Sequence, residues 1–205
     1  MVTVIDYGVG NLFSLASSLR AIGEEAVVTG DADKVRSAGR LILPGVGAFG
    51  DAAEKLRRGG LYEALLDAAG RGVPLLGICL GMQLLFDESF EYGRHRGLGL
   101  IPGAVRAMEP VDKSLKIPHM GWNALHITQP CPILKNTREG EHMYFVHSYY
   151  ADTAPENIFA TAEYGMEVPA VVGRGSVFGA QFHPEKSGER GLAILRAFCA
   201  MEGRT

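Results

Sequence analysis

The sequence predicts an α/β protein whose N-terminal half is built from strand–loop–helix units and whose C-terminal half adds antiparallel strands. Up to the segment around Cys79, short apolar stretches alternate with glycine loops and amphipathic helical stretches. From Gly103 onward, short alternating stretches separated by turn residues replace that rhythm. With 205 residues, 47% of them hydrophobic, the chain is expected to fold as one soluble domain over 1–205.

The first expected unit joins a strand at 2–5 to a helix at 12–22, whose leucine and isoleucine side chains recur on one face. The loop between them, 6–11, contains glycines but lacks the third glycine of a dinucleotide fingerprint, so a nucleotide site is not favoured. Strands follow at 25–29 and 40–43. Two amphipathic helices are then expected, at 52–57 and 61–71.

The glycine loop 44–50 directly follows the expected strand at 40–43. Glycines there would let backbone amides face a ligand closely. An ordinary tight turn explains the same residues equally well when the loop is taken alone.

Cys79 lies where a buried strand at 73–76 meets the start of a helix at 82–86, with a glycine two residues before it and two after. This is the nucleophile-elbow arrangement, in which a sharp strand-to-helix turn exposes a reactive side chain. The helix N-terminus favours a thiolate, and the backbone N–H of Leu80 would face a developing oxyanion. A buried, inert cysteine is the alternative. The flanking glycines favour the nucleophile.

The C-terminal half is expected to hold short strands and one helix. The strands are placed at 104–108, 121–127, 142–149, 158–163, 168–173 and 176–181. The helix follows Ser187, a suitable N-cap, and carries an apolar face. The loop 89–96 and the segment 203–205 support no functional claim from the sequence.

A cysteine nucleophile needs a base, and the base needs an orienting partner. His183 ends an apolar strand, and Pro184 is expected to hold the chain extended so that His183 and Glu185 face the same side. A carboxylate in that position can fix the tautomer of the imidazole. For a His-Pro-Glu string alone, a surface turn is the alternative.

The composition argues against several classes of partner and cofactor. The net charge of -3 gives no reason to expect nucleic acid or an anionic membrane as partner. The sequence has no apolar run long enough to span a membrane, and its first residues do not form a signal peptide. The three cysteines are far apart and the histidines lack ligand spacing, so we expect no disulfide, metal or cofactor, and a cytoplasmic location.

Together these motifs resemble the class I, triad-type glutamine amidotransferases over essentially the whole chain. The resemblance is carried by the elbow Gly77-Ile78-Cys79-Leu80-Gly81-Met82-Gln83 and by the late His183-Pro184-Glu185. It implies a twisted, mixed, mostly parallel sheet flanked by helices. It also implies hydrolysis of glutamine to glutamate and ammonia, with Cys79 as nucleophile, His183 moving protons and Glu185 orienting the imidazole.

The same resemblance implies roles for further residues. The amides of Val46 and Leu80 would hold the oxyanion, after a reorientation of the loop that carries Val46. The glutamine pocket would include Gly47, Gln83, Ser148 and Tyr149.

Other motifs resemble one branch of this family, whose members pass ammonia to a separate polypeptide in histidine biosynthesis. These motifs lie at 6–11, 44–49, 118–123, 144–149 and 181–187. The implied partner is a (β/α)8-barrel cyclase subunit that receives ammonia through an internal channel and makes imidazole glycerol phosphate and AICAR. Asn11, Met120 and Trp122 would lie near the interface; for Trp122, burial in the core is the alternative.

Three other functions are the alternatives to this one. A glutaminase subunit of another pathway, such as pyridoxal phosphate synthesis, is opposed by the loop 44–47 and by the motif around Trp122. A non-catalytic interaction protein is opposed by the intact cysteine, histidine and glutamate. A stand-alone cysteine hydrolase would show no dependence on a partner chain.

Overall fold

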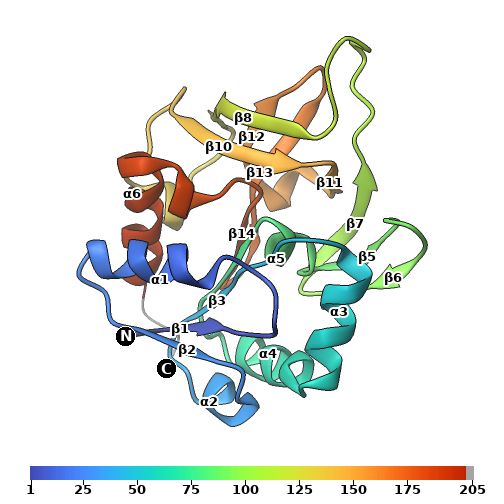
Figure 1. Cartoon of the computed structure of the whole chain (residues 1–205). Helices are drawn as coiled ribbons and strands as arrows, with labels where there is room; N and C mark the ends of the chain where they lie inside the picture. The colour runs from blue at the N-terminus through green and yellow to red at the C-terminus, as the bar shows by residue number, and fades with distance from the viewer. Residues whose placement is uncertain (202–205) are drawn as a thin grey trace.

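The computed structural model describes residues 1–201 and is organised around an eight-stranded mixed sheet (Figure 1). The strand order is β2-β1-β3-β4-β14-β13-β12-β9. The strands are β1 Val2–Ile5, β2 Ala26–Thr29, β3 Leu41–Leu43, β4 Leu75–Ile78, β9 His126–Ile127, β12 Ile158–Glu163, β13 Glu167–Arg174 and β14 Val177–Ala180. Parallel pairing joins β2 through β14, and antiparallel pairing adds β13, β12 and β9. The predicted fold class is therefore confirmed.

Helices cover both faces of this sheet. They are α1 Leu12–Ala21, α2 Ala32–Arg36, α3 Phe49–Arg58, α4 Leu61–Gly70, α5 Leu80–Gln83 and α6 Gly188–Cys199. Alternate strand residues such as Ile42 and Leu76 pack with the buried faces of α1 and α6, whereas Leu41 and Leu75 pack with α3 and α4. Parallel strands covered on both faces become continuously apolar, which explains the unbroken burial of β1, β3 and β4.

Two smaller sheets extend the molecule beyond the carboxyl ends of the parallel strands (Figure 1). One pairs β8 His119–Ala124 with β10 His142–His147, and the other joins β5 Phe86–Ser89, β6 His95–Arg96, β7 Ile101–Ala107 and β11 Tyr149–Asp152. The backbone N–H of His183 donates to the carbonyl of Tyr144 at 2.9 Å. This bond fixes β10 over the end of β14, and the candidate site forms between them.

Several element boundaries differ from the predictions. The helix expected at 82–86 is instead α5, and Phe86 begins β5 because it pairs with Ile101 on the neighbouring strand. The segment 142–149 is divided at Ser148 into β10 and β11, which belong to different sheets. Helix α2 was not expected; it is short and is capped by the Asp31 side chain.

The described residues also form three short 3-10 helices: η1 Pro132–Leu134, η2 Pro155–Asn157 and η3 Pro184–Lys186. Within residues 1–201, no helix is long and apolar enough to cross a membrane. The segment 203–205 lies outside the described residues.

Candidate active site

Cys79 lies at the strand-to-helix turn, as predicted. Strand β4 ends at Ile78, α5 begins at Leu80, and Cys79 between them has φ 54° and ψ -112°. A non-glycine residue with positive φ is strained, and such strain persists only where surrounding contacts enforce it. Here the N–H of Cys79 donates to the carbonyl of Ala180 at 2.8 Å, and the Cys79 carbonyl accepts from Gln83 at 3.1 Å.

Close packing explains the glycines around this turn. A Cβ placed on Gly81 would lie 1.8 Å from the carbonyl oxygen of Leu43, and one placed on Gly45 would lie 2.7 Å from the backbone nitrogen of Gly81. Both distances are far below van der Waals contact. The glycine loop after β3 therefore lies directly against the elbow, which brings Val46 and Gly47 to the pocket that Cys79 lines.

His183 and Glu185 form a buried pair beside the elbow. The Nδ1 atom of His183 lies 2.8 Å from Oε1 of Glu185, and the two side chains are 2% and 4% exposed. The prediction of an extended chain through Pro184 is wrong. Instead η3 turns the chain back within one residue of His183, and that turn brings the carboxylate under the imidazole.

The imidazole of His183 is strongly basic. Burial alone lowers the pKa of His183, but interaction with the Cys79 sulfur and the Glu185 carboxylate outweighs burial and raises the pKa to about 9. Because Nδ1 is held by Glu185, Nε2 is the nitrogen left for Cys79. This Nε2 atom is buried and has no hydrogen-bond partner among residues 1–201.

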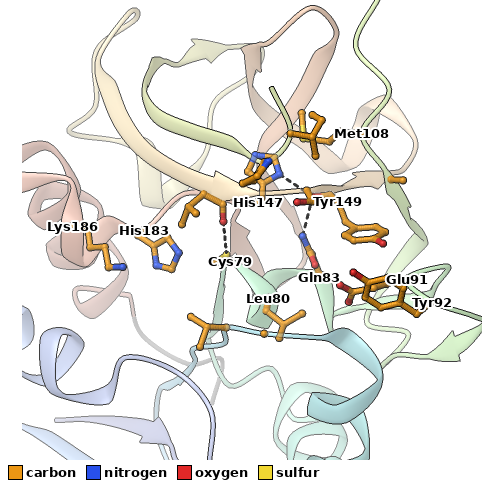
Figure 2. Close-up of a pocket in the computed structure, with 17 residues that line it drawn as sticks. Cys79, Leu80, Gln83, Glu91, Tyr92, Met108, His147, Tyr149, His183 and Lys186 are labelled. Carbon is orange, nitrogen blue, oxygen red and sulfur yellow. Dashed lines mark hydrogen bonds between the residues drawn. The ribbon is translucent and has the colours of Figure 1, made fainter. Parts of the chain in front are cut away.

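The predicted site residues are brought together around one pocket. The cavity has a volume of about 540 Å³ and is lined by Cys79 and His183 (Figure 2). All the residues predicted for the oxyanion and for glutamine also line it: Val46, Gly47, Leu80, Gln83, Ser148 and Tyr149. Glu185 does not line this pocket but borders a much smaller cavity behind His183. The carboxylate can therefore act only through the imidazole.

The side chain of Gln83 is held in one orientation. Its Nε2 donates to the carbonyl oxygen of Tyr149 at 3.0 Å (Figure 2). The same Nε2 donates to Oε1 of Gln181 at 3.1 Å. Gln181 in turn donates from Nε2 toward the Cys79 sulfur at 3.9 Å. We missed Gln181 in the sequence. Its position two residues before His183, and so on the same side of an extended segment, was the available signal.

The loop 89–96, for which the sequence supported no functional claim, contributes Glu91 and Tyr92 to the pocket. Glu91 is 9% exposed, and its Oε2 accepts from the N–H of Phe49, the first residue of α3. The helix end therefore fixes a buried carboxylate in the pocket wall, with Tyr92 next to it (Figure 2). A glutamate in a polar loop carries no local sequence signal of this kind.

The three residues predicted for a partner interface are not equally exposed. Met120 and Trp122 on β8 are 60% and 57% exposed, so the alternative that Trp122 belongs to the core is wrong. Asn11 is the N-cap of α1, where its side chain accepts from the N–H of Ser14 at 3.2 Å. Asn11 also borders the small cavity behind His183.

Among residues 1–201, no group of three or more His, Cys, Asp or Glu side chains is placed to hold a metal ion. The cysteines Cys79, Cys131 and Cys199 are all free and buried.

Comparison with known proteins agrees with this geometry. The family model described as glutamine amidotransferase class-I matches residues 3–201. The chain is 51% identical over 202 residues to the imidazole glycerol phosphate synthase subunit HisH of Geobacillus kaustophilus (strain HTA426), covering 97% of this chain and 95% of that relative. The corresponding subunit of Listeria monocytogenes (serovar 1/2a, strain EGD-e) is 47% identical over 198 residues, covering 97% and 94%.

Solved structures share the fold at lower sequence identity. A chain described as a glutamine amidotransferase superimposes with a TM-score of 0.75 at 19% identity, covering 98% of this chain and 100% of that one. A chain from the PurLQS structure of Thermotoga maritima gives 0.76 at 24% identity, with coverage of 97% and 96%. The chain belongs to the class I glutamine amidotransferases and, within them, to the HisH subunits of imidazole glycerol phosphate synthase.

Proposed function

We propose that this chain hydrolyses the side-chain amide of glutamine and supplies the released ammonia to a separate cyclase subunit. The observation that carries this proposal is the strained turn at Cys79, which lines one pocket with His183 while Glu185 holds the far side of the imidazole. The single glutaminase domain spans 1–205 in this proposal. Its three free cysteines fit the reducing cytoplasm.

The reaction begins at the Cys79 sulfur. The thiolate attacks the amide carbon of glutamine while His183 carries the proton, and the resulting oxyanion is held by the amides of Leu80 and Val46. His183 then passes the proton from Nε2 to the leaving nitrogen, so that ammonia departs and a γ-glutamyl thioester remains on the sulfur. A water molecule, deprotonated by the same nitrogen, attacks the thioester and releases glutamate.

The remainder of the pocket recognises the amino-acid part of the substrate. Gln83, Gly47, Ser148 and Tyr149 line it, together with the buried carboxylate of Glu91. We assign Glu91 to the α-ammonium of glutamine, because a buried carboxylate is stabilised by an opposite charge.

The partner is a (β/α)8-barrel cyclase that uses the ammonia to make imidazole glycerol phosphate and AICAR. The HisH relatives are themselves named as subunits of that synthase, which supports this assignment. Exposed Met120 and Trp122 on β8 suit a protein interface, where large amphipathic side chains are favoured. We also assign Asn11 to this interface.

The test measures glutamate release from glutamine by the purified chain, alone and mixed with the barrel cyclase and its acceptor substrate. A large increase only in the mixture, absent with Cys79→Ala, is expected. An unchanged rate would overturn the named partner while leaving glutaminase chemistry. No glutamate under any condition would overturn the enzymatic proposal.

A further inference from the structure

Two buried histidines lie side by side at the glutamine pocket: His147, the last residue of β10, and His119, the first residue of β8. His147 is 6% exposed and lines the pocket, and His119 behind it is 2% exposed. The Nδ1 atom of His119 lies 3.0 Å from Nε2 of His147. The glutaminase mechanism uses neither residue.

The backbone determines which nitrogens carry protons. The Nδ1 atom of His147 lies 2.8 Å from the carbonyl oxygen of Tyr149, which can only accept, so this nitrogen is the N–H (Figure 2). In the neutral ring, Nε2 of His147 is then an acceptor, and His119 must donate to it from Nδ1. That leaves Nε2 of His119 as an acceptor for the side-chain amide of Asn123, 3.2 Å away.

All the hydrogen bonds of this chain therefore point toward the pocket. They run from Asn123 through His119 and His147 to the Tyr149 carbonyl, which also accepts from Gln83 at 3.0 Å. Asn123 is fixed at the other end, because its Nδ2 also donates to the carbonyl of Glu163 at 2.7 Å. A second proton on His147 would place its Nε2–H against the Nδ1–H of His119. A second proton on His119 would place its Nε2–H against the side-chain N–H of Asn123.

The surroundings keep both rings neutral. His119 is stacked between the rings of Phe145 and Tyr164, with centroid separations of 4.7 and 4.1 Å. Burial lowers the pKa of His119 to about 4 and that of His147 to about 3. Since a donor–donor contact and burial both oppose the charged form, the direction of the chain persists at neutral pH.

We propose that His147, backed by His119, is a positioning residue that holds the Tyr149 carbonyl and thereby orients Gln83 in the glutamine pocket. The inference rests on the proposed function, because it takes Gln83 to contact the substrate. It also gives β8, which carries the exposed Trp122, a continuous hydrogen-bonded connection to the pocket.

Two variants, each with a side-chain amide in place of one ring nitrogen, separate the two hydrogen bonds of His147. In His147→Asn, the side-chain amide can occupy the position of Nδ1 and still donate to Tyr149, although the bond to His119 is lost. In His147→Gln, the amide reaches only the position of Nε2, so the Tyr149 carbonyl loses its imidazole donor. His126→Gln is the matched control, since that histidine is 60% exposed on β9.

Steady-state glutamine hydrolysis is measured in the complex with the cyclase subunit. We expect His147→Gln to lower kcat/KM at least about tenfold, mainly through KM, and His147→Asn to stay within about threefold of wild type. In a Gln83→Ala background, His147→Gln is expected to add less than about twofold. Alkylation of Cys79 by iodoacetamide should be unchanged. Equal losses in the Asn and Gln variants, or additive losses with Gln83→Ala, would overturn the proposal.

Nitrogen-15 NMR of the full-length chain tests the hydrogen-bond direction independently of activity. Both imidazoles should be neutral with the proton on Nδ1 at pH 7, and His147→Asn should leave His119 neutral. A doubly protonated ring, or a neutral ring with its proton on Nε2, at either histidine would overturn the proposed hydrogen-bond chain. If wild type showed these tautomers but no glutaminase activity in the complex, the proposed function would fail and the hydrogen-bond chain would stand.

Discussion

The Nδ1 atom of His183 and the Oε1 atom of Glu185 lie 2.8 Å apart, and neither side chain is more than 4% exposed. Glu185 does not line the substrate pocket, so it influences the reaction only by holding and charging the imidazole. This separation distinguishes the contributions of the nucleophile, the base and the carboxylate, and each can be measured alone.

Replacing Cys79 with alanine is expected to lower the pKa of His183 from about 9. The sulfur and Glu185 both raise the pKa of His183, whereas burial lowers it. Without the sulfur, only Glu185 counteracts the effect of burial, so the pKa falls. An NMR titration of His183 in wild type and in Cys79→Ala measures the change. An unchanged pKa would mean that Glu185 alone sets the charge of the imidazole.

Replacing Glu185 with glutamine is expected to reduce kcat of the complex by about two orders of magnitude or more, with KM for glutamine nearly unchanged. The amide can no longer fix the tautomer or stabilise the imidazolium, but it does not contact the pocket. Cys79→Ala should abolish turnover, so the glutamate variant remains the more active of the two. Glu189→Gln, at a carboxylate that is 77% exposed, is the control. A rise in KM with unchanged kcat would contradict the orienting role.

Replacing Gly81 with alanine is expected to destabilise the chain by at least about 3 kcal/mol. The added methyl would lie 1.8 Å from the carbonyl oxygen of Leu43. That oxygen belongs to the backbone of β3, which cannot move aside as the end of a flexible side chain could. Urea unfolding measures the loss. Gly70→Ala, at the end of α4, is the matched control, because outside its chain neighbours and its own helix backbone the added Cβ would have no atom within 4 Å. Similar unfolding free energies for the two variants would show that the elbow can open.

The elbow and the histidine–glutamate pair could be predicted from the sequence because their patterns are local. Glycine spacing around Cys79 and an apolar strand before it specify a sharp turn, and the His-Pro-Glu string keeps base and carboxylate within two residues. The parallel part of the sheet was predictable for the same reason: each strand and its following helix are adjacent in sequence.

The rest of the pocket depends on contacts between distant segments. The wall that holds Gln83 exists because β10 and β11 lie over the ends of β4 and β14, and no local pattern specifies that placement. Glu91 joins the pocket only because the N-terminus of α3 takes its carboxylate. The η3 turn that places Glu185 is likewise held by a distant segment, because Ser187 Oγ accepts from the N–H of Tyr144 on β10 at 3.0 Å.

Acid should destabilise the chain through the buried histidine pair. The pKa values of His119 and His147 are lowered to about 4 and 3 in the folded state, against an ordinary value near 6.5. Between these values the unfolded chain binds more protons, so stability falls as pH drops below about 6.5. From pH 8 to pH 5 we expect a loss of roughly 2 kcal/mol for each histidine.

His183 changes the pH dependence of the unfolding free energy in the opposite direction. The effect of His119 and His147 must therefore be measured by comparing variants in which His183 is unchanged. The folded pKa of His183 is raised to about 9, and its stabilisation is therefore full below 6.5 and lost as pH rises through 9. His119→Phe keeps the stack on Phe145 and Tyr164 but removes one titrating ring. Urea unfolding between pH 5 and pH 8 should show a smaller acid-induced loss in His119→Phe than in wild type or His126→Phe. Because His183 is unchanged in all three proteins, an equal loss in all of them would mean that the buried pair is charged in the folded chain.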